Sequence, residues 1–203
     1  MVWYSYYMNN YRLEQMVSRQ LNTPQTSSMG RLFDAVSALI GICQTATYDG
    51  EPAIALEAAI YSAPNYTAAA QTIPDRTANS KAYQFTINNS TTPKVVDPKP
   101  VILAILKDLQ AGEKPTLIAR KFHDAVAQMI VDICQVARNK TGIDTVAISG
   151  GVFMNRYLNQ TVPLLLEQSG YTVLQHCNLP ANDGCIAYGQ AVIAAAQAGR
   201  ALN

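Results

Sequence analysis

The sequence predicts an α/β protein that is rich in helices and contains a small mixed sheet. Near the carboxyl end, two short apolar segments, 145–148 and 171–176, alternate with helical segments in the order strand, helix, strand, loop, helix. Such a unit usually holds its strands parallel and opens the loops that follow them on one side of the sheet. Elsewhere the apolar residues recur mostly at helical spacing, so helices should form most of the remaining fold.

Size and composition allow one substantial hydrophobic core and argue against two classes of function. Of the 203 residues, 49% are hydrophobic and 14% are charged, which suffices for one large domain or two small lobes. The 15 basic and 14 acidic residues are scattered and leave a net charge of +1, which counts against a nucleic-acid-binding surface. No apolar run reaches the ~18 residues that a membrane-spanning helix needs, and no signal-peptide pattern is present.

Cysteine spacing bears on the compartment. The four cysteines, Cys43, Cys134, Cys177 and Cys185, lie far apart and show no C-x-x-C pattern, so we expect reduced thiols in a cytoplasmic protein. The aromatic segment 2–7 has neither a targeting pattern nor the character of a domain start. We expect it to be a packing segment of a longer protein.

Three helices should form within the first 62 residues. Segment 11–21 carries its apolar residues at helical spacing and should be amphipathic. The second helix should begin after a cap at Ser27 or Ser28 and run to about Ile42. The third should cover 51–61 and present an alanine-rich face for close packing.

Residues 63–99 differ in composition from the rest, with many Pro, Asn, Ser and Thr residues. They should form a loop followed by a β-hairpin, with strands at 83–87 and 94–96. This stretch is the best candidate for an internal boundary. It divides a helical segment, 1–62, from an α/β part, 100–203, within a single domain that spans the chain.

The α/β part should contain four helices, at about 100–111, 116–137, 155–168 and 186–198. Pro163 should kink the third of these or divide it into two. His123 lies among apolar positions and has no second ligand at metal-binding spacing. A core histidine that is hydrogen-bonded to a backbone group is therefore favoured over a metal ligand.

The segment DTVAISGGVFMN, residues 144–155, predicts a turn between a strand and a helix that could bind a ligand. Gly150 and Gly151 can adopt positive φ and let a ligand approach the main chain closely. The helix that starts near Asn155 offers N–H groups and the positive end of its dipole to an anion such as phosphate. Many such turns carry glycine only in order to turn, so these residues alone leave the ligand role open.

Two other groups of residues can be interpreted in two ways. Gly30 and Asp34 share a helix face beside Arg31, so a flat group could lie on the backbone while the carboxylate holds hydroxyls. A packing glycine with a solvated aspartate also explains that pattern and is favoured on the residues alone. Asp183, in the loop before the last helix, could cap that helix or present a carboxylate to a cation.

Four motifs, taken in order and spacing, resemble the carboxyl-terminal part of the HypF family, the carbamoyltransferases of [NiFe]-hydrogenase maturation. They are TSSMGRLFDAVSALIG, YDGEPAIALEAAI, AISGGVFMNRYLN and LPANDGCIAYGQAVIAA. The resemblance covers the chain from about Leu13 to Gln197. It is least distinctive between Ser62 and Lys94.

The resemblance implies both a fold and a function. The chain would be the second lobe of an actin-like ATPase (ribonuclease H-like) fold, related to the threonylcarbamoyl-transferase that modifies tRNA. HypF proteins use carbamoyl phosphate and ATP, by way of carbamoyl-adenylate, to carbamoylate the C-terminal cysteine of HypE, which yields a cyanide ligand of the hydrogenase iron. On this sequence the implied nucleotide-binding residues are Gly30, Arg31, Asp34, Gly150, Gly151 and Asn155. Asp183 matches the aspartate that ligates a divalent metal, zinc or iron, in the family.

Departures from the family pattern limit this expectation. The family's H-x-x-x-H metal motif has no counterpart here, since His123 and His176 are far apart, and the acylphosphatase-like, zinc-finger-like and adenylate-forming domains are absent. We therefore expect a fragment or truncated homologue that is inactive alone and contributes no nucleophile. Metal binding by this chain should be weak, because one carboxylate holds a divalent cation poorly.

Two other functions and one further property are also compatible with the sequence. The chain could be the lobe of a related O-carbamoyltransferase or of a tRNA threonylcarbamoyl-transferase, although its near-neutral charge counts against tRNA. It could also be a non-catalytic module that binds a nucleotide or a maturation partner. The surface that would meet the first lobe predicts some tendency to form a homodimer.

Overall fold

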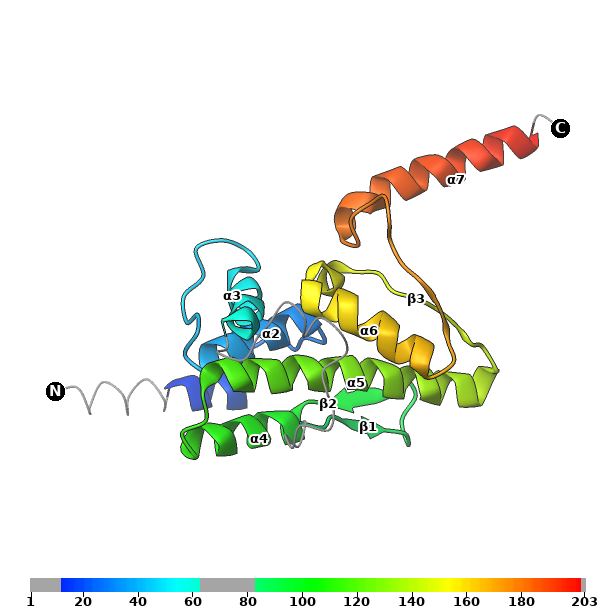
Figure 1. Cartoon of the computed structure of the whole chain (residues 1–203). Coiled ribbons are helices and arrows are strands. Elements are labelled where there is room, and N and C mark those ends of the chain that lie inside the picture. Colours follow the sequence, from blue (N-terminus) through cyan, green and yellow to red (C-terminus); the bar gives the residue numbers. More distant parts are fainter. Residues whose placement is uncertain (1–11, 63–82, 202–203) are drawn as a thin grey trace.

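The structure, a computed structural model, describes residues 12–62 and 83–201. The aromatic segment 2–7 and the predicted loop at 63–82 lie outside the described residues. The elements in chain order are α2 (Met29–Leu39), α3 (Glu51–Tyr61), β1 (Thr86–Asn88), β2 (Val95–Asp97), α4 (Lys99–Gln110), α5 (Pro115–Thr141), β3 (Thr145–Ala147), the 3₁₀ helix η2 (Gly151–Met154), α6 (Arg156–Gln168), β4 (Thr172–Leu174), the 3₁₀ helix η3 (Asp183–Cys185) and α7 (Ile186–Ala201) (Figure 1).

Helix α5 is the centre of the fold. It has 27 residues, so it is about 40 Å long, and α3, α4 and α6 all pack against it (Figure 1). Pro115 suits its first turn, where no intrahelical N–H bond is lost. Gly142 ends it with φ of 72° and donates its N–H to the Arg138 carbonyl at 2.8 Å.

The core lies where α2, α3, α5 and α6 meet. Phe33 from α2 and Phe122 from α5 pack edge to face, with ring centroids 4.9 Å apart. The largest fully buried apolar side chains are Phe33, Val36, Leu56, Ile60, Val101, Ile105, Ile118, Phe122, Val126, Leu158 and Leu166. They come from five helices, so burial of these helix faces is what holds the elements together.

The helix boundaries follow their local signals closely. Helix α3 covers the predicted residues, and Ser28 caps α2 by accepting a hydrogen bond from the Arg31 N–H at 3.3 Å. Helix α2 ends at Leu39, three residues before the predicted end, because Gly41 adopts φ of 76° and reverses the chain. Of the two alternatives predicted at Pro163, a kink or a division into two helices, the division is wrong, since α6 runs through this residue.

The strands form two separate two-stranded sheets in place of one mixed sheet. Strands β1 and β2 are the predicted hairpin, antiparallel with Ile87 opposite Val96. Strands β3 and β4 are parallel as expected, with Val146 opposite Val173. Both segments that follow the parallel strands therefore leave the same edge of this sheet, and the glycine turn and the Asp183 loop meet there.

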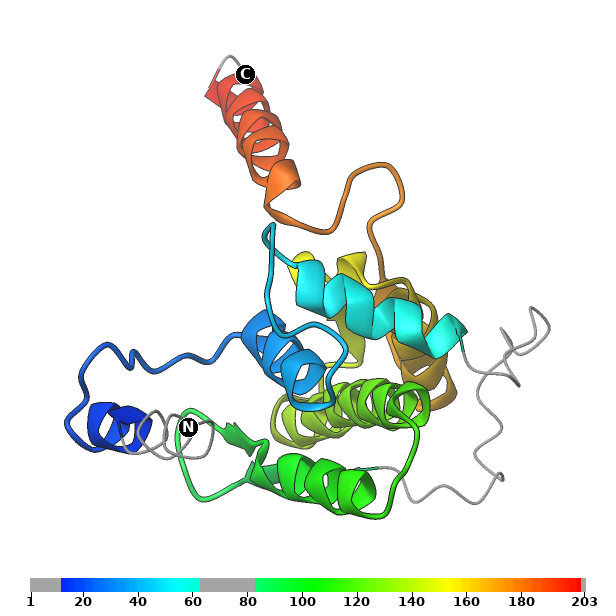
Figure 2. The same ribbon diagram turned by 90° about the vertical axis from the view of Figure 1, so that its left-hand side faces the viewer.

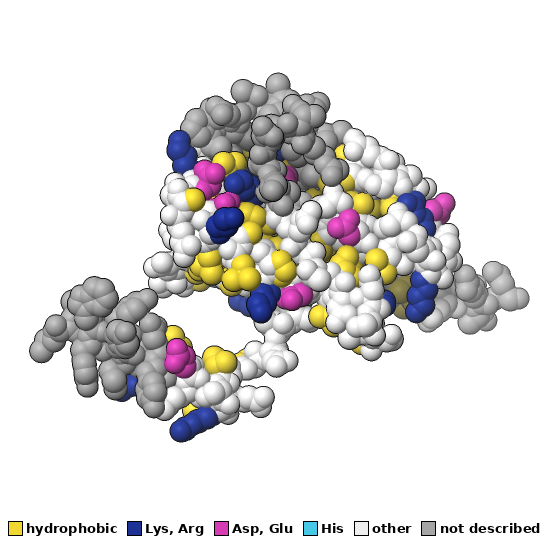
Figure 3. Space-filling view, turned by 90° about the horizontal axis from the view of Figure 1, so that it is seen from below, with side chains coloured by type: hydrophobic (Ala, Val, Ile, Leu, Met, Phe, Trp, Pro, Cys, Tyr) yellow, Lys and Arg dark blue, Asp and Glu magenta, His cyan; other side chains and the backbone are white. Residues whose placement is uncertain are grey.

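Two helical segments stand away from the body. Residues 12–18 form a short helix beside the body, and α7 projects from the opposite side (Figures 1 and 2). Four apolar side chains of α7, Ile186, Tyr188, Val192 and Ile193, are more than half exposed. Basic and acidic side chains are interspersed over the underside of the body, so that face carries no large field of one sign (Figure 3). Among the described helices, none combines the length and the apolar composition that crossing a membrane demands.

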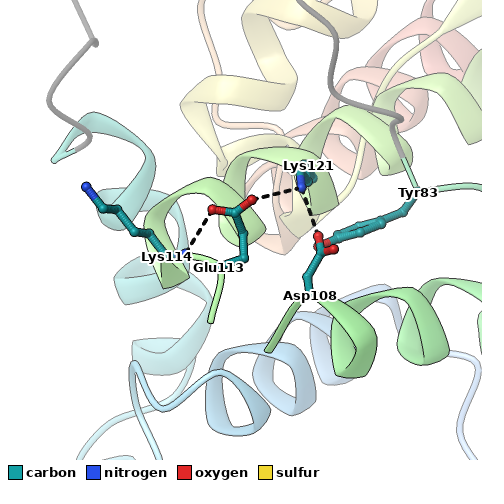
Figure 4. Close-up of polar contacts among 5 residues, drawn as sticks. All are labelled: Tyr83, Asp108, Glu113, Lys114 and Lys121. Atoms are coloured by element: carbon teal, nitrogen blue, oxygen red, sulfur yellow. Dashed lines mark hydrogen bonds and ion pairs between the residues drawn. The ribbon is translucent and has the colours of Figure 1, made fainter. Parts of the chain in front are cut away.

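A polar network ties the hairpin side of the molecule to α5. The buried Tyr83 donates its hydroxyl to Asp108 of α4 at 2.6 Å, and Lys121 of α5 contacts the same carboxylate at 2.9 Å and Glu113 at 3.5 Å (Figure 4). Burial alone would raise the pKa of Asp108, but the hydrogen bonds from Tyr83 and Lys121 outweigh it and lower that pKa. The network joins the start of the hairpin segment, α4 and α5.

Candidate functional site

A cleft of about 700 Å³ opens where α2 and α3 face the glycine turn and the start of α6. This volume falls in the range of small-molecule and cofactor sites. Its lining residues are Ser28, Met29, Gly30, Arg31, Phe33, Asp34, Asp49, Gly50, Ala53, Ile54, Glu57, Gly151, Val152, Met154, Asn155 and Asn182. Five of the predicted nucleotide-binding residues thus line one cleft, although they come from segments more than a hundred residues apart. Gly150 does not line it but shapes the adjacent turn.

The α2 side of the cleft carries its one basic side chain. Arg31 makes ion pairs with Asp34 at 3.1 Å and with Asp49 at 3.1 Å. Asp34 uses Oδ2 for this contact, whereas its Oδ1 is buried and has no hydrogen-bond partner among the described residues. A buried acceptor without a donor is costly, so this oxygen is suited to a donor that a ligand would bring.

Gly30 leaves the α2 backbone bare beside that carboxylate. A Cβ placed on Gly30 would meet only the Ser28 Oγ, at 3.6 Å, which is an ordinary contact. Packing within the chain therefore does not require glycine here. A bare helix backbone instead allows a flat group to lie close against it, as the sequence suggested.

The glycine turn follows β3 directly. Gly150 has φ of 106°, a conformation that side chains rarely adopt, and donates its N–H to the Ala181 carbonyl at 2.7 Å. This bond joins the turn to the loop after β4. The N–H groups of Gly151 and Val152, the first two of η2, donate to no group in the described part of the chain. They are the donors that this turn leaves available to an anion.

Helix α6 starts where the sequence predicted, but the first N–H groups of this helix are not all free. The 3₁₀ helix η2 separates the glycine pair from α6, whose cap is Asn155. The Arg156 N–H donates to the Glu57 carboxylate at 2.8 Å, and the Leu158 N–H donates to Asn155 Oδ1 at 3.0 Å. The expectation that α6 offers unpaired N–H groups to a phosphate is therefore wrong for these two groups, because α3 and the cap residue already occupy them.

The Asn155 side chain also forms a hydrogen bond with His123. The His123 ring is fully buried, with Nδ1 2.8 Å from the Ala119 carbonyl and Nε2 2.9 Å from Asn155 Nδ2. The predicted core histidine with a backbone partner is thus confirmed, and it has a second partner that the sequence did not reveal. Burial, joined by the nearby charge of Arg120, lowers the pKa of His123 to about 4, which outweighs the opposing effect of the Ala119 hydrogen bond.

Asp183 lies at the edge of the cleft and does not line it. The cap of η3 is the neighbouring Asn182, whose Oδ1 accepts a hydrogen bond from the Gly184 N–H at 3.1 Å. The alternative in which Asp183 is a helix cap is therefore wrong. Its exposed carboxylate has no hydrogen-bond or ion-pair partner among the described residues.

The donors for a metal ion are incomplete. No three His, Cys, Asp or Glu side chains in the described part of the chain converge as a metal-binding group, so Asp183 would be a lone ligand. The residues present do not fit a complete zinc or iron site. A metal there would need ligands that these residues do not supply.

Charge in the cleft is unevenly distributed. Among its lining residues, Arg31 is the single cation, and Asp34, Asp49 and Glu57 are carboxylic acids. Burial raises the pKa of Glu57, although the N–H of Arg156 opposes that shift. The cleft therefore suits hydroxyl and amine donors better than it suits a bare polyphosphate.

Sequence reasoning missed three lining residues that matter here. Glu57 sits inside a helical motif, and its partner Arg156 is 99 positions away, so no local pattern could have identified the contact. Asp49 precedes α3 as an ordinary loop residue. Asn182 could have been found, since Asn is as good a helix cap as the Asp beside it.

Comparison with known proteins places the chain in a family. A sequence model described as "Carbamoyltransferase, Kae1-like Domain, second subdomain" matches residues 4–190. Carbamoyltransferase HypF of Synechocystis sp. is 39% identical over 183 residues, which are 90% of this chain and 21% of that protein. Probable carbamoyltransferase HypF of Methanocaldococcus jannaschii is 31% identical over 89% of this chain and 21% of its own length.

Solved structures agree with these relatives. A crystal structure described as full-length HypF in the phosphate- and nucleotide-bound form matches with a TM-score of 0.74 and 35% identity, over 89% of this chain and 22% of that one. HypF of T. kodakarensis shares the fold at a TM-score of 0.66 and 21% identity. The fold is thus a helix-rich lobe of the actin-like type, and the chain spans about one fifth of the length of these proteins. The chain belongs to the HypF carbamoyltransferase family, as the second subdomain of its Kae1-like domain.

Proposed function

We propose that this chain supplies one wall of an ATP-binding cleft in a hydrogenase-maturation carbamoyltransferase. In the complete enzyme, ATP and carbamoyl phosphate would react by way of carbamoyl-adenylate, and the carbamoyl group would pass to the C-terminal cysteine of HypE. The related full-length HypF has been solved with phosphate and a nucleotide bound, which supports nucleotide binding in this family.

The observation that carries the proposal is the unpartnered Asp34 Oδ1 beside the bare backbone of Gly30. A ribose offers two hydroxyl donors to a carboxylate, and an adenine or ribose ring is flat enough to lie against a glycine in a helix. Arg31 holds the other oxygen of Asp34 and so fixes the direction of the carboxylate. The nucleoside part of ATP would occupy the α2 side.

The phosphates would lie toward the glycine turn. The unused N–H groups of Gly151 and Val152 support this position. An anion at the start of α6 would instead be repelled by the carboxylate of Glu57, a residue of α3 that contacts the Arg156 N–H. The chemical contribution of this chain would be to bind and orient the nucleotide and to donate hydrogen bonds to its phosphates. We infer no nucleophile in this chain, because the acceptor thiol would belong to HypE.

A glycine substitution tests the nucleotide site without weakening the fold. In Gly30→Ala, the helix should be no less stable than in wild type, because the new Cβ meets only Ser28 Oγ at 3.6 Å, while the new methyl group blocks close approach and weakens ATP binding at least tenfold. Gly189→Ala in α7 is the matched control, since it makes the same helix substitution away from the cleft. Calorimetric titration with ATP measures affinity, and urea unfolding measures stability. Equal ATP affinity in Gly30→Ala and wild type would refute the site.

An activity assay distinguishes a catalytically incomplete lobe from a complete enzyme. We expect the chain alone to catalyse no carbamoyl-phosphate-dependent exchange between ATP and pyrophosphate. Exchange by the purified chain would contradict the proposal that it is catalytically incomplete. Binding of a peptide with a C-terminal cysteine, measured in parallel, tests the proposed HypE acceptor.

A further inference from the structure

His123 links the centre of the molecule to the cleft through a chain of three hydrogen bonds. The chain runs from the Ala119 carbonyl through the His123 ring to the Asn155 amide and ends at the Leu158 N–H. Ala119 and His123 belong to α5, whereas Asn155 and Leu158 belong to the start of α6. Since Asn155 also lines the cleft, these three hydrogen bonds connect a buried ring to the proposed nucleotide site.

The direction of every bond in this chain is determined at its two ends. The Ala119 carbonyl can only accept, so His123 Nδ1 carries the proton, and in the neutral ring Nε2 must then accept. The Leu158 N–H can only donate, so Asn155 Oδ1 must face it and Nδ2 must face His123. Both ends independently require the same orientation of the Asn155 amide.

Packing holds the ring in place. The His123 ring meets Phe33 edge to face at 5.0 Å between centroids and meets Tyr157 at 5.6 Å in a similar geometry. A ring flip would break both hydrogen bonds within a close-packed core. The acceptor nitrogen therefore points steadily at Asn155.

We propose that His123 is a positioning residue for the nucleotide site: it orients the Asn155 amide so that its second Nδ2–H is left as a hydrogen-bond donor for the ligand. Without the histidine, only the Leu158 N–H still holds the amide in this orientation, and rotation by half a turn, at the cost of that one bond, would present the amide oxygen instead. An amide oxygen there would repel the phosphate oxygens that the N–H would bind. This inference rests on the proposed nucleotide site, and it names the residue that sets the polarity of one of its contacts.

A spectroscopic test needs no ligand. In ¹⁵N-labelled full chain, His123 should show the Nδ1–H tautomer and titrate near pH 4. Asn155→Asp keeps an oxygen to cap α6 but cannot donate to Nε2, so the ring should take up a second proton and its pKa should rise by at least one unit. An Nε2–H tautomer in wild type, or an unchanged His123 pKa in Asn155→Asp, would overturn the inference.

A binding test addresses the consequence. His123→Phe fills the same space but accepts no hydrogen bond, and ATP affinity should fall about tenfold; His123→Gln, whose side-chain oxygen can accept from Asn155, should restore part of it. A fully folded His123→Phe that binds ATP as wild type does would overturn the inference while leaving the nucleotide site intact. If wild type binds no ATP, the proposed function fails, and the tautomer and the Asn155→Asp titration still decide whether His123 orients the amide.

Discussion

Lowering the pH from 7 to 4.5 should remove roughly 2.5 kcal/mol of folding free energy through His123. In the folded chain its pKa is about 4, against 6.5 for an unperturbed histidine. Between these values the unfolded chain binds a proton that the folded chain excludes, so stability falls as the pH falls through this window. One pKa unit corresponds to about 1.4 kcal/mol, so the difference between 6.5 and about 4 corresponds to roughly 3.4 kcal/mol once the loss is complete below pH 4, and roughly 2.5 kcal/mol of it is lost by pH 4.5.

Urea unfolding of wild type and His123→Gln at pH 7, 5.5 and 4.5 measures this loss. Glu57 and Asp108, whose pKa values are also shifted, remain in both proteins, so their contributions cancel in the difference. The stability of wild type should fall by roughly 2.5 kcal/mol more than that of the variant between pH 7 and 4.5. Parallel losses in the two proteins would refute the assignment of a buried, neutral His123.

Three further substitutions probe the cleft, the network and the turn. Glu57→Gln removes a negative charge from the cleft, and ATP affinity by calorimetry should rise about fivefold if the charge lies ~8 Å from the phosphates in a medium of ε ~40; unchanged or weaker binding would contradict the charge argument. Tyr83→Phe removes the hydrogen bond to the Asp108 carboxylate and should lower the free energy of unfolding by about 1.5 kcal/mol, whereas no loss would show that the bond is dispensable. Gly150→Ala should cost about 1–3 kcal/mol because of its positive φ, and Gly151→Ala, which has no such strain, should cost less than about 0.5; equal costs would exclude backbone strain as the cause.

Local signals in the sequence were enough for most elements. Helix α3 begins and ends as predicted because Gly50 and Pro52 mark its start clearly. The hairpin and the parallel pair follow from short apolar segments bounded by turn residues. The amphipathic pattern of residues 11–21 predicted a buried face, yet Leu13 and Val17 are 57% and 64% exposed, because the described residues supply no partner for that face.

The cleft itself could be predicted only in part. Glycines and an aspartate at fixed spacing indicated which segments would meet, and five of the six proposed nucleotide-binding residues do line one cleft. The contacts that set its chemistry could not be read from spacing. Glu57 reaches the start of α6, and His123 reaches Asn155, through packing of helices that are remote in the sequence. The 3₁₀ turn η2, which lies between β3 and α6, has no distinct sequence signal.

Helix α7 has the mechanical character of a lever. Its 16 residues make an arm of about 24 Å, and η3 joins the base of that arm directly to Asn182, a wall residue of the cleft. The hydrogen bond from the Gly150 N–H to the Ala181 carbonyl fixes the chain next to Asn182. We expect that a change in the angle of α7 would widen or narrow the cleft at Asn182. A protein that binds the carboxyl-terminal end of α7 could then alter nucleotide binding without contacting the cleft. Spin labels on α7 and α3 would report both motions together, and a cleft width that ignores the position of α7 would exclude this coupling.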